Sequence, residues 1–253
     1  MTTYSYADYA KHYDRRETDG RYNWKYRQVM RESDMRMLAL LDEKAASRRN
    51  IKLVDLGCGN GNLLFHLKQK FPQWILHGKD LAPNLIDECQ TDTSLAGIHF
   101  DVADITVPPS TCEEEVYDFV VLIAVLQVLP PDAFNKAIAS IARYLKPGGW
   151  LINFDGYHPF IEQELIKVEI TASASRPDFP TMNYYYPSRA NAAELCRKAG
   201  FKQVEYEDFY MPFDLQRPTG NPAASHTELL VDGRRFSMLG VVAQPWTFLK
   251  ACK

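Results

Sequence analysis

The stretch Val54-Asp55-Leu56-Gly57-Cys58-Gly59-Asn60-Gly61, "VDLGCGNG", places three glycines in five positions directly behind a short apolar run. A glycine-rich loop that leaves a strand and opens a helix presents bare backbone N–H groups to a ligand at the carboxyl edge of a sheet. The spacing is Gly-x-Gly-x-Gly, whereas pyrophosphate-binding dinucleotide domains use Gly-x-Gly-x-x-Gly, and no Lys-Ser/Thr pair follows as in a P-loop. The loop therefore favours a nucleotide-like ligand without phosphates, and a tight turn that binds nothing is the alternative.

The sequence around this loop alternates short β-type runs with helical patterns. Strands are expected at 51–56, 74–80, 98–104, 117–125 and 150–155, with helices at 62–70, 84–89 and 132–145. Such alternation requires right-handed crossovers and so predicts a mostly parallel sheet that is covered on both faces. The run "FVVLIAV" is apolar at consecutive positions, as a central buried strand should be.

The regular alternation stops after Asp155. Ser188 is a plausible N-cap for a helix that Gly200 ends, and a further strand is expected at 202–210. Asp232-Gly233 lies between two β-type runs and predicts a tight hairpin turn. Apolar residues at helical spacing before residue 50 predict N-terminal helices.

Composition limits the function classes. The chain has 253 residues, 46% of them hydrophobic, which is enough for one large core with an appended cap. Five cysteines without a CxxC pair, and an N-terminus without signal-peptide character, predict a cytoplasmic protein. The longest apolar run is far shorter than the roughly 20 residues of a membrane span. A net charge of −3 gives no overall attraction to nucleic acid. We therefore expect neither a membrane nor a nucleic acid as the main partner.

Two carboxylates that follow the loop in the sequence narrow the chemical class of the expected ligand. Asp80 ends the second expected strand, about 20 residues on, where a carboxylate can accept both hydroxyls of a ribose. Asp104 ends the third expected strand, in "VADI", and is a suitable acceptor for an exocyclic amine. Together with the loop, these residues describe a site for an adenosine that lacks phosphate.

These features resemble the class I S-adenosylmethionine-dependent methyltransferases over roughly residues 51–155. "VDLGCGNG" is similar to the family's first motif, and "GKDLAPNLI", "VADI", "YDFVVLIAVLQVLP" and "LKPGGWLI" follow in the family's order. The resemblance implies an α/β fold with a Rossmann-like, seven-stranded, mostly parallel sheet of order 3-2-1-4-5-7-6, in which strand 7 is antiparallel. It also implies S-adenosyl-L-methionine as cofactor and S-adenosyl-L-homocysteine as product.

The resemblance assigns cofactor contacts by position in the motifs. The glycines would lie against the methionine part, Asp55 would orient their loop, and Asp80 would hold the ribose. Tyr13 lies on an expected helix where many family members carry a Tyr-Asp pair, although plain helix packing explains it equally well. The predicted cofactor set is Tyr13, Asp55, Gly57, Gly59, Gly61, Asp80, Leu81, Asp104, Ile105 and Ile123.

The acceptor is less defined. His158 follows the fifth strand and is the candidate general base, because histidine titrates near neutral pH; a structural histidine in a loop is the alternative. Tyr157, Tyr184 and Tyr185 are candidate walls of the acceptor pocket, with lid packing as the alternative. No acidic cluster typical of a metal site is recognisable, so no metal is expected.

These residues favour a small-molecule acceptor, with oxygen preferred over nitrogen. A carbohydrate or surface glycan, a nucleic acid, and a cofactor-binding protein without transferase activity stay open. We expect an N-terminal helical cap at 1–50 and the methyltransferase domain at 51–253. Within this domain, insertions at 156–190 and 211–239 are expected near the acceptor site. The second insertion contains the β-hairpin, and formation of a homodimer through it is the alternative to closing the pocket.

Overall fold

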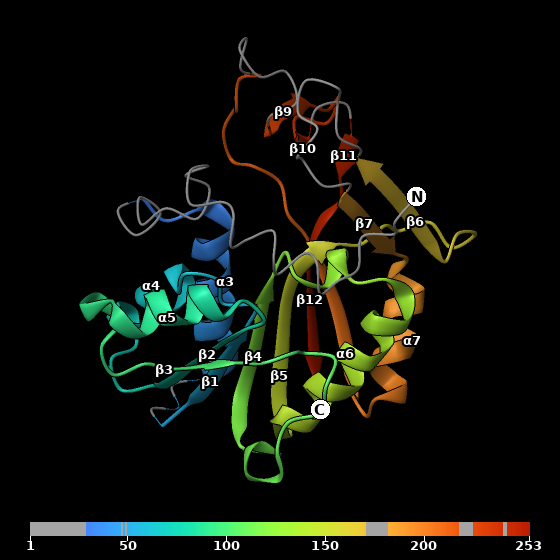
Figure 1. The fold of residues 1–253 in the computed structure, drawn as a ribbon. Coiled ribbons are helices and arrows are strands. Elements are labelled where there is room, and N and C mark those ends of the chain that lie inside the picture. The colour runs from blue at the N-terminus through green and yellow to red at the C-terminus, as the bar shows by residue number, and fades with distance from the viewer. Residues whose placement is uncertain (1–28, 47, 49, 171–181, 218–224, 240–241) are drawn as a thin grey trace.

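A seven-stranded sheet forms the centre of the protein. The computed structural model describes residues 29–46, 48, 50–170, 182–217, 225–239 and 242–253. The strand order is β3-β2-β1-β4-β5-β12-β8, and β12 runs antiparallel to both of its neighbours while the remaining pairs are parallel. The strands are β1 (Lys52–Leu56), β2 (Ile75–Asp80), β3 (His99–Val102), β4 (Tyr117–Ile123), β5 (Leu145–Gly156), β8 (Gln203–Asp208) and β12 (Trp246–Cys252). The predicted order 3-2-1-4-5-7-6 is confirmed (Figure 1).

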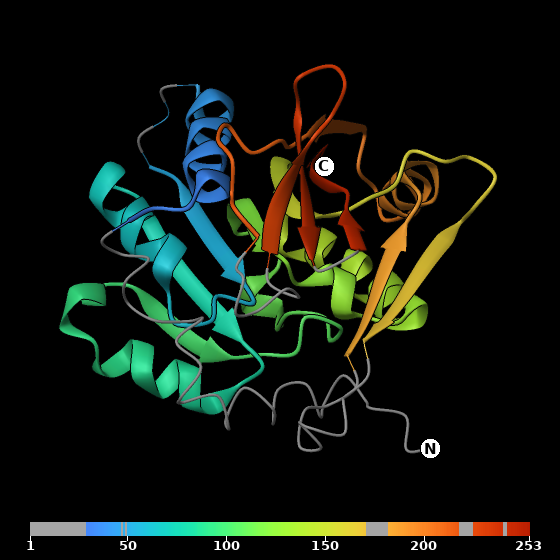
Figure 2. The ribbon, with the colours of Figure 1, turned by 90° about the horizontal axis from the view of Figure 1, so that it is seen from above.

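Helices cover both faces of this sheet, as Figures 1 and 2 show. One face packs against α3 (Glu32–Ala45), α4 (Asn62–Lys70) and α5 (Pro83–Thr91). The other face packs against α6 (Pro131–Tyr144) and α7 (Arg189–Lys198). Short 3-10 turns lie at η1 (Thr93–Leu95), η2 (Thr111–Glu113) and η3 (Leu126–Val128). Central strands such as β4 are therefore buried on both sides, which explains their unbroken apolar sequence.

Helix α3 shares the core of the sheet. Its Met37, Leu40 and Leu41 are fully buried in the same cluster as Leu53 of β1. This part of the predicted 1–50 cap thus belongs to one of the two helical layers. The predicted helices at 1–28 lie outside the described residues.

The segment after β5 contains two strands that the sequence did not predict. β6 (Leu165–Ile170) and β7 (Met182–Pro187) pair antiparallel into a separate ribbon. The Tyr184-Tyr185-Tyr186 run in β7 has no polar alternation, so it carries no period-2 signal. α7 begins as expected, because the Ser188 hydroxyl accepts a hydrogen bond from the Asn191 N–H at 3.1 Å.

A small three-stranded sheet lies beyond the carboxyl ends of β4 and β5 (Figure 1). It consists of β9 (Ser225–Leu229), β10 (Arg235–Leu239) and β11 (Val242–Gln244). The predicted turn at Asp232-Gly233 joins β9 to β10, with Gly233 at a φ of 83°. Pro245 separates β11 from β12, because proline cannot donate a ladder hydrogen bond. None of the helices in the described ranges is long and apolar enough to cross a membrane.

Candidate functional site

The glycine loop between β1 and α4 adopts a backbone that requires glycine. Gly57, Gly59 and Gly61 have φ angles of 80°, 54° and 73°, in the left-handed region that side chains disfavour. A Cβ on Gly57 would lie 2.5 Å from Cγ2 of Val125, and one on Gly61 would lie 2.8 Å from Cδ1 of Leu95. The loop therefore has no room for side chains at these positions, and bare backbone is available to a ligand.

Asp80 at the end of β2 fixes this loop. Its Oδ2 accepts a hydrogen bond from the Gly59 N–H at 2.8 Å, and its Oδ1 accepts one from the Ala82 N–H at 2.9 Å. The N–H groups of Gly57 and Cys58 donate to the Lys79 carbonyl at 2.7 and 3.0 Å. Each carboxylate oxygen has a second lone pair, so Asp80 retains acceptors for the two hydroxyls of a ribose.

Asp55 is a buried carboxylate at the root of the loop. Its side chain is 3% exposed. Burial, followed by the negative charges of Asp80 and Asp34, raises the pKa of Asp55 to about 8. A buried carboxylate of this kind is stabilised by a positively charged group, because a nearby cation favours the ionised form.

The end of β3 lies beside the end of β2, where the Ala103 N–H donates to the Asp80 carbonyl at 2.9 Å. Oδ1 of Asp104 accepts hydrogen bonds from the N–H and the hydroxyl of Thr106, at 2.8 and 2.7 Å, so Oδ2 is the oxygen left for a ligand. The Ile105 side chain is buried in the hydrophobic cluster that includes residues of α6 and α7. The structure thus brings the three predicted acidic residues and the glycines to one edge of the sheet.

Asp155, at the carboxyl end of β5, holds the loop that follows β4. It is 1% exposed and accepts hydrogen bonds from the consecutive N–H groups of Val125, Leu126 and Gln127 at 3.2, 2.9 and 3.3 Å. Sequence reasoning gave Asp155 no role. The signal available was its position, since it ends a predicted strand as Asp80 does.

His158 lies two residues beyond β5, and its peptide bridges to Ser188 before α7. Its side chain is 1% exposed, and neither ring nitrogen has a hydrogen-bond partner among the described residues. Burial lowers the pKa of His158, so the imidazole is neutral at pH 7. A buried polar group without a partner is unusual in a folded protein and points to a ligand or a water at that position.

Comparison with known proteins gives the family. A family model described as "Methyltransferase domain" matches residues 53–149. A trans-aconitate 2-methyltransferase of Rhodococcus jostii (strain RHA1) is 31% identical over 193 residues, which are 74% of this chain and 69% of that protein. The human tRNA N(3)-cytidine methyltransferase METTL2B is 30% identical over 135 residues, but these are 47% of this chain and 33% of that protein.

A solved structure of Burkholderia thailandensis 1,6-didemethyltoxoflavin-N1-methyltransferase, with 1,6-didemethyltoxoflavin and S-adenosylhomocysteine bound, has the same fold. The TM-score is 0.58 at 18% identity, over 97% of this chain and 87% of that one. The chain belongs to the class I S-adenosylmethionine-dependent methyltransferases. The methyltransferase uses S-adenosylmethionine as its methyl donor.

The residues of the methyltransferase fit this cofactor. Side chains at Gly57 and Gly61 would strike Val125 and Leu95, so the loop stays bare backbone. Asp80 keeps acceptors free, and Asp55 is a buried carboxylate that a positively charged amino group would stabilise. We propose that Asp55, the glycines and Ile123 face the methionine part, and that Asp80, Leu81, Asp104 and Ile105 face the adenosine. Predicted Tyr13 lies outside the described residues.

The three tyrosines predicted for the acceptor pocket occupy different places. Tyr157 is fully buried in the hydrophobic cluster that includes residues of α6 and α7, so it has no surface with which to line a pocket. Its hydroxyl donates a hydrogen bond to Oδ1 of Asn153 at 2.5 Å. Tyr184 stacks with Tyr186 at 6.3 Å between ring centroids. Tyr185 points to the opposite face of β7, because side chains alternate along a strand, and lines a cavity of about 120 Å³ against α6 and α7. Only Tyr184 of the three stays in our proposed acceptor wall.

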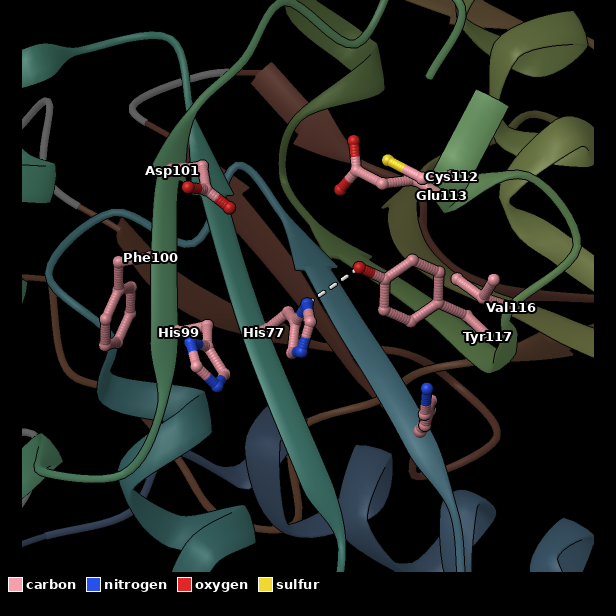
Figure 3. A pocket seen from close by; sticks show the side chains of 9 residues that line it. His77, His99, Phe100, Asp101, Cys112, Glu113, Val116 and Tyr117 are labelled. Atoms are coloured by element: carbon pink, nitrogen blue, oxygen red, sulfur yellow. Dashed lines mark hydrogen bonds between the residues drawn. The ribbon is translucent and has the colours of Figure 1, made fainter. Parts of the chain in front are cut away.

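A second cavity, of about 290 Å³, lies toward the amino ends of β1, β3 and β4 (Figure 3). Within it, Nδ1 of His77 and the hydroxyl of Tyr117 are 2.7 Å apart, and the Lys79 ammonium lies 2.7 Å from Glu113. Burial lowers the pKa of His77 and raises that of Tyr117. These groups largely satisfy one another, and the cavity is lined in part by the first residues of β1, β3 and β4, whereas the glycine loop follows the last residue of β1. No group of three potential metal ligands occurs among the described residues.

Proposed function

We propose that this methyltransferase methylates an oxygen of a small-molecule acceptor, with His158 as the proton acceptor. The observation that carries the proposal is the unpaired imidazole of His158, buried just beyond the carboxyl end of β5. Because burial lowers its pKa, the ring is neutral and has a lone pair available at pH 7. A neutral imidazole of this kind suits general-base chemistry.

The reaction places modest demands on the protein. The cofactor supplies an electrophilic methyl group on a sulfonium, and the protein must align a nucleophile about 3 Å from it and exclude water. His158 would accept the proton of an acceptor hydroxyl as that oxygen forms its new bond. An ionised carboxylate has no proton to lose, so an acid acceptor would use His158 for positioning only.

The acceptor side of the site is aromatic. Tyr186 packs against Gly156, where an added Cβ would lie 2.3 Å from its ring, and Tyr184 stacks on Tyr186. Trp246 stacks on Phe154 at 4.9 Å between ring centroids, on the neighbouring strands β12 and β5. Tyr186 and Phe154 are buried beneath the half-buried rings of Tyr184 and Trp246, and the flat surfaces of these two favour a small organic acceptor. The similarity to a trans-aconitate 2-methyltransferase supports the same class.

Nucleic acid is the second candidate acceptor, favoured by the similarity to a tRNA methyltransferase over part of the chain. The net charge of −3 opposes it. Binding of a tRNA that weakens steeply with salt, together with methyl transfer to it, would establish this alternative. Transfer to an amine would establish the nitrogen alternative.

The test compares His158→Ala and His158→Gln with the wild type on a panel of small acids, including trans-aconitate, and hydroxylated compounds. We expect wild-type affinity for S-adenosylhomocysteine and a fall of about 10²-fold or more in the rate of methyl transfer to a hydroxyl. His77→Ala removes the histidine that contacts Tyr117 in the cavity of about 290 Å³, and it should leave the rate unchanged. Full activity of both His158 variants on the accepted substrate would remove His158 from the reaction.

A further inference from the structure

The N–H groups at the start of the loop after β4 depend on one carboxylate. Val125, Leu126 and Gln127 begin the η3 turn, and the first N–H groups of a helical turn have no partner within it. All three donate to Asp155, and Leu126, at 2.9 Å, makes the shortest of the three bonds. Burial raises the pKa of Asp155 to about 6, so it is ionised at neutral pH and both oxygens accept hydrogen bonds.

The Asp155 carboxylate is itself held in place by buried side chains of β5 and the residue that follows it. Nδ2 of Asn153 donates to Oδ2 of Asp155 at 2.9 Å, and Oδ1 of Asn153 accepts from the Tyr157 hydroxyl at 2.5 Å. All three side chains are at most 1% exposed. Ala124, just before the loop, has a φ of 57°, a strained value for alanine that must be held by surrounding contacts.

The loop held by Asp155 forms one wall of the glycine loop. Val125 is the residue that a Cβ on Gly57 would strike, at 2.5 Å, so the two loops are in close contact. On the other side, the Gly57 N–H is bonded to the Lys79 carbonyl of β2. Gly57 is therefore fixed between β2 and a loop whose position is set from β5.

We propose that Asp155 is a positioning residue for the cofactor: its bonds to residues 125–127 hold Val125 against Gly57 and so shape the methionine end of the site. The inference rests on the placement of the cofactor at the glycine loop. Asp155 itself touches no reacting atom in this account and acts through the two loops.

The test measures affinity for S-adenosylhomocysteine by calorimetry and the melting temperature of the ligand-free protein. Asp155→Ala leaves three buried N–H groups without an acceptor and should weaken binding tenfold or more. Asp155→Asn, with its amide oxygen in place of Oδ2, keeps an acceptor for Leu126 and Asn153 and should restore part of the affinity. Tyr206→Phe is the control, since it removes a hydrogen bond, from the Tyr206 hydroxyl to the Arg189 carbonyl at 2.8 Å, that lies outside the network around Asp155; it should lower the melting temperature and leave the affinity unchanged.

If Asp155→Ala binds S-adenosylhomocysteine with wild-type affinity, the inference about Asp155 is overturned and the cofactor site is unaffected. Equal losses of affinity in Asp155→Ala and Tyr206→Phe would also overturn it, because they would reflect general destabilisation. If Asp155→Ala does not fold, the comparison of Asp155→Asn with Tyr206→Phe decides in the same way, with weakened binding expected only for Asp155→Asn. Failure of the wild type to bind S-adenosylhomocysteine would instead overturn the cofactor site itself, and the inference with it.

Discussion

We expect cofactor binding to displace a proton from Asp55. The pKa of about 8, caused by burial and by the carboxylates of Asp80 and Asp34, leaves about nine tenths of the ligand-free molecules with a protonated Asp55 at pH 7. The amino group of the bound cofactor would favour the ionised carboxylate. Binding at pH 7 should therefore release close to one proton.

The size of the effect on affinity follows from the ionised fraction, which rises from about a tenth at pH 7 to about nine tenths at pH 9. Asp55→Asn keeps the shape of the side chain and removes the titration. The ratio of wild-type to Asp55→Asn affinity should therefore rise about tenfold over this range, or about 1.4 kcal/mol. Taking the ratio removes the titration of the cofactor's own groups.

Calorimetric titration with S-adenosylhomocysteine, in buffers of different ionisation enthalpy at pH 7, counts the protons directly. The wild type should release close to one, and Asp55→Asn close to none. A wild type that releases no proton, or a variant that releases the same number, would refute the electrostatic reasoning about Asp55.

The same shift predicts the stability of the ligand-free protein. Because the pKa of Asp55 in the folded state lies above the ordinary value of 3.8, the folded state binds more protons between pH 4 and 8, and its stability falls as pH rises through this window. Asp55→Asn should raise the free energy of unfolding at pH 7 by up to ~4 kcal/mol, and the gain should vanish toward pH 4. Urea titrations at the two pH values measure it, and an equal gain at both would contradict the assignment.

Three further variants test other parts of the account. Asp80→Ala should weaken S-adenosylhomocysteine binding by about 10- to 100-fold in calorimetry, since hydrogen bonds to a charged group are lost, and unchanged affinity would remove the ribose assignment. Gly57→Ala should lower the free energy of unfolding by about 2–4 kcal/mol, because it combines a positive φ with a clash against Val125; adding Val125→Ala should recover only the clash, and full recovery would show that φ is unimportant. Tyr117→Phe should cost about 1–2 kcal/mol of stability, because it leaves Nδ1 of His77 without its partner, and should leave cofactor affinity unchanged; a loss of affinity would link that cavity to the cofactor site.

The sequence predicts the sheet and its cofactor edge well, for a physical reason. In a parallel sheet the motif residues follow strand ends, so reading Asp80 and Asp104 as strand-end residues also places them at one edge beside the glycine loop. The alternation of apolar runs and helical patterns predicts a mostly parallel sheet, and the resemblance to the methyltransferase family predicts the order of its strands. Local sequence carries this information because each strand and its following turn are continuous in the chain.

The acceptor side is predicted less well, because its contacts join segments that are distant in sequence. Tyr157 reads as a pocket residue beside His158, yet it packs inward against Tyr206 of β8. Tyr185 faces away from Tyr184 because an unrecognised strand alternates its side chains. Asp155 is visible as a strand-end carboxylate, but its partners lie about 30 residues earlier in the loop after β4, and only the folded sheet brings them together.

The crystal structure of the complex with S-adenosylhomocysteine tests the central claim most directly. The account predicts ribose hydroxyls within about 2.6–3.2 Å of the Asp80 carboxylate, the amino-acid end of the ligand against Gly57 and Gly59, and the sulfur on the side of the site where His158 lies. A ligand bound elsewhere, for example in the cavity beside His77 and Tyr117, or bound at the glycine loop with Asp80 turned away from the ribose, would contradict it.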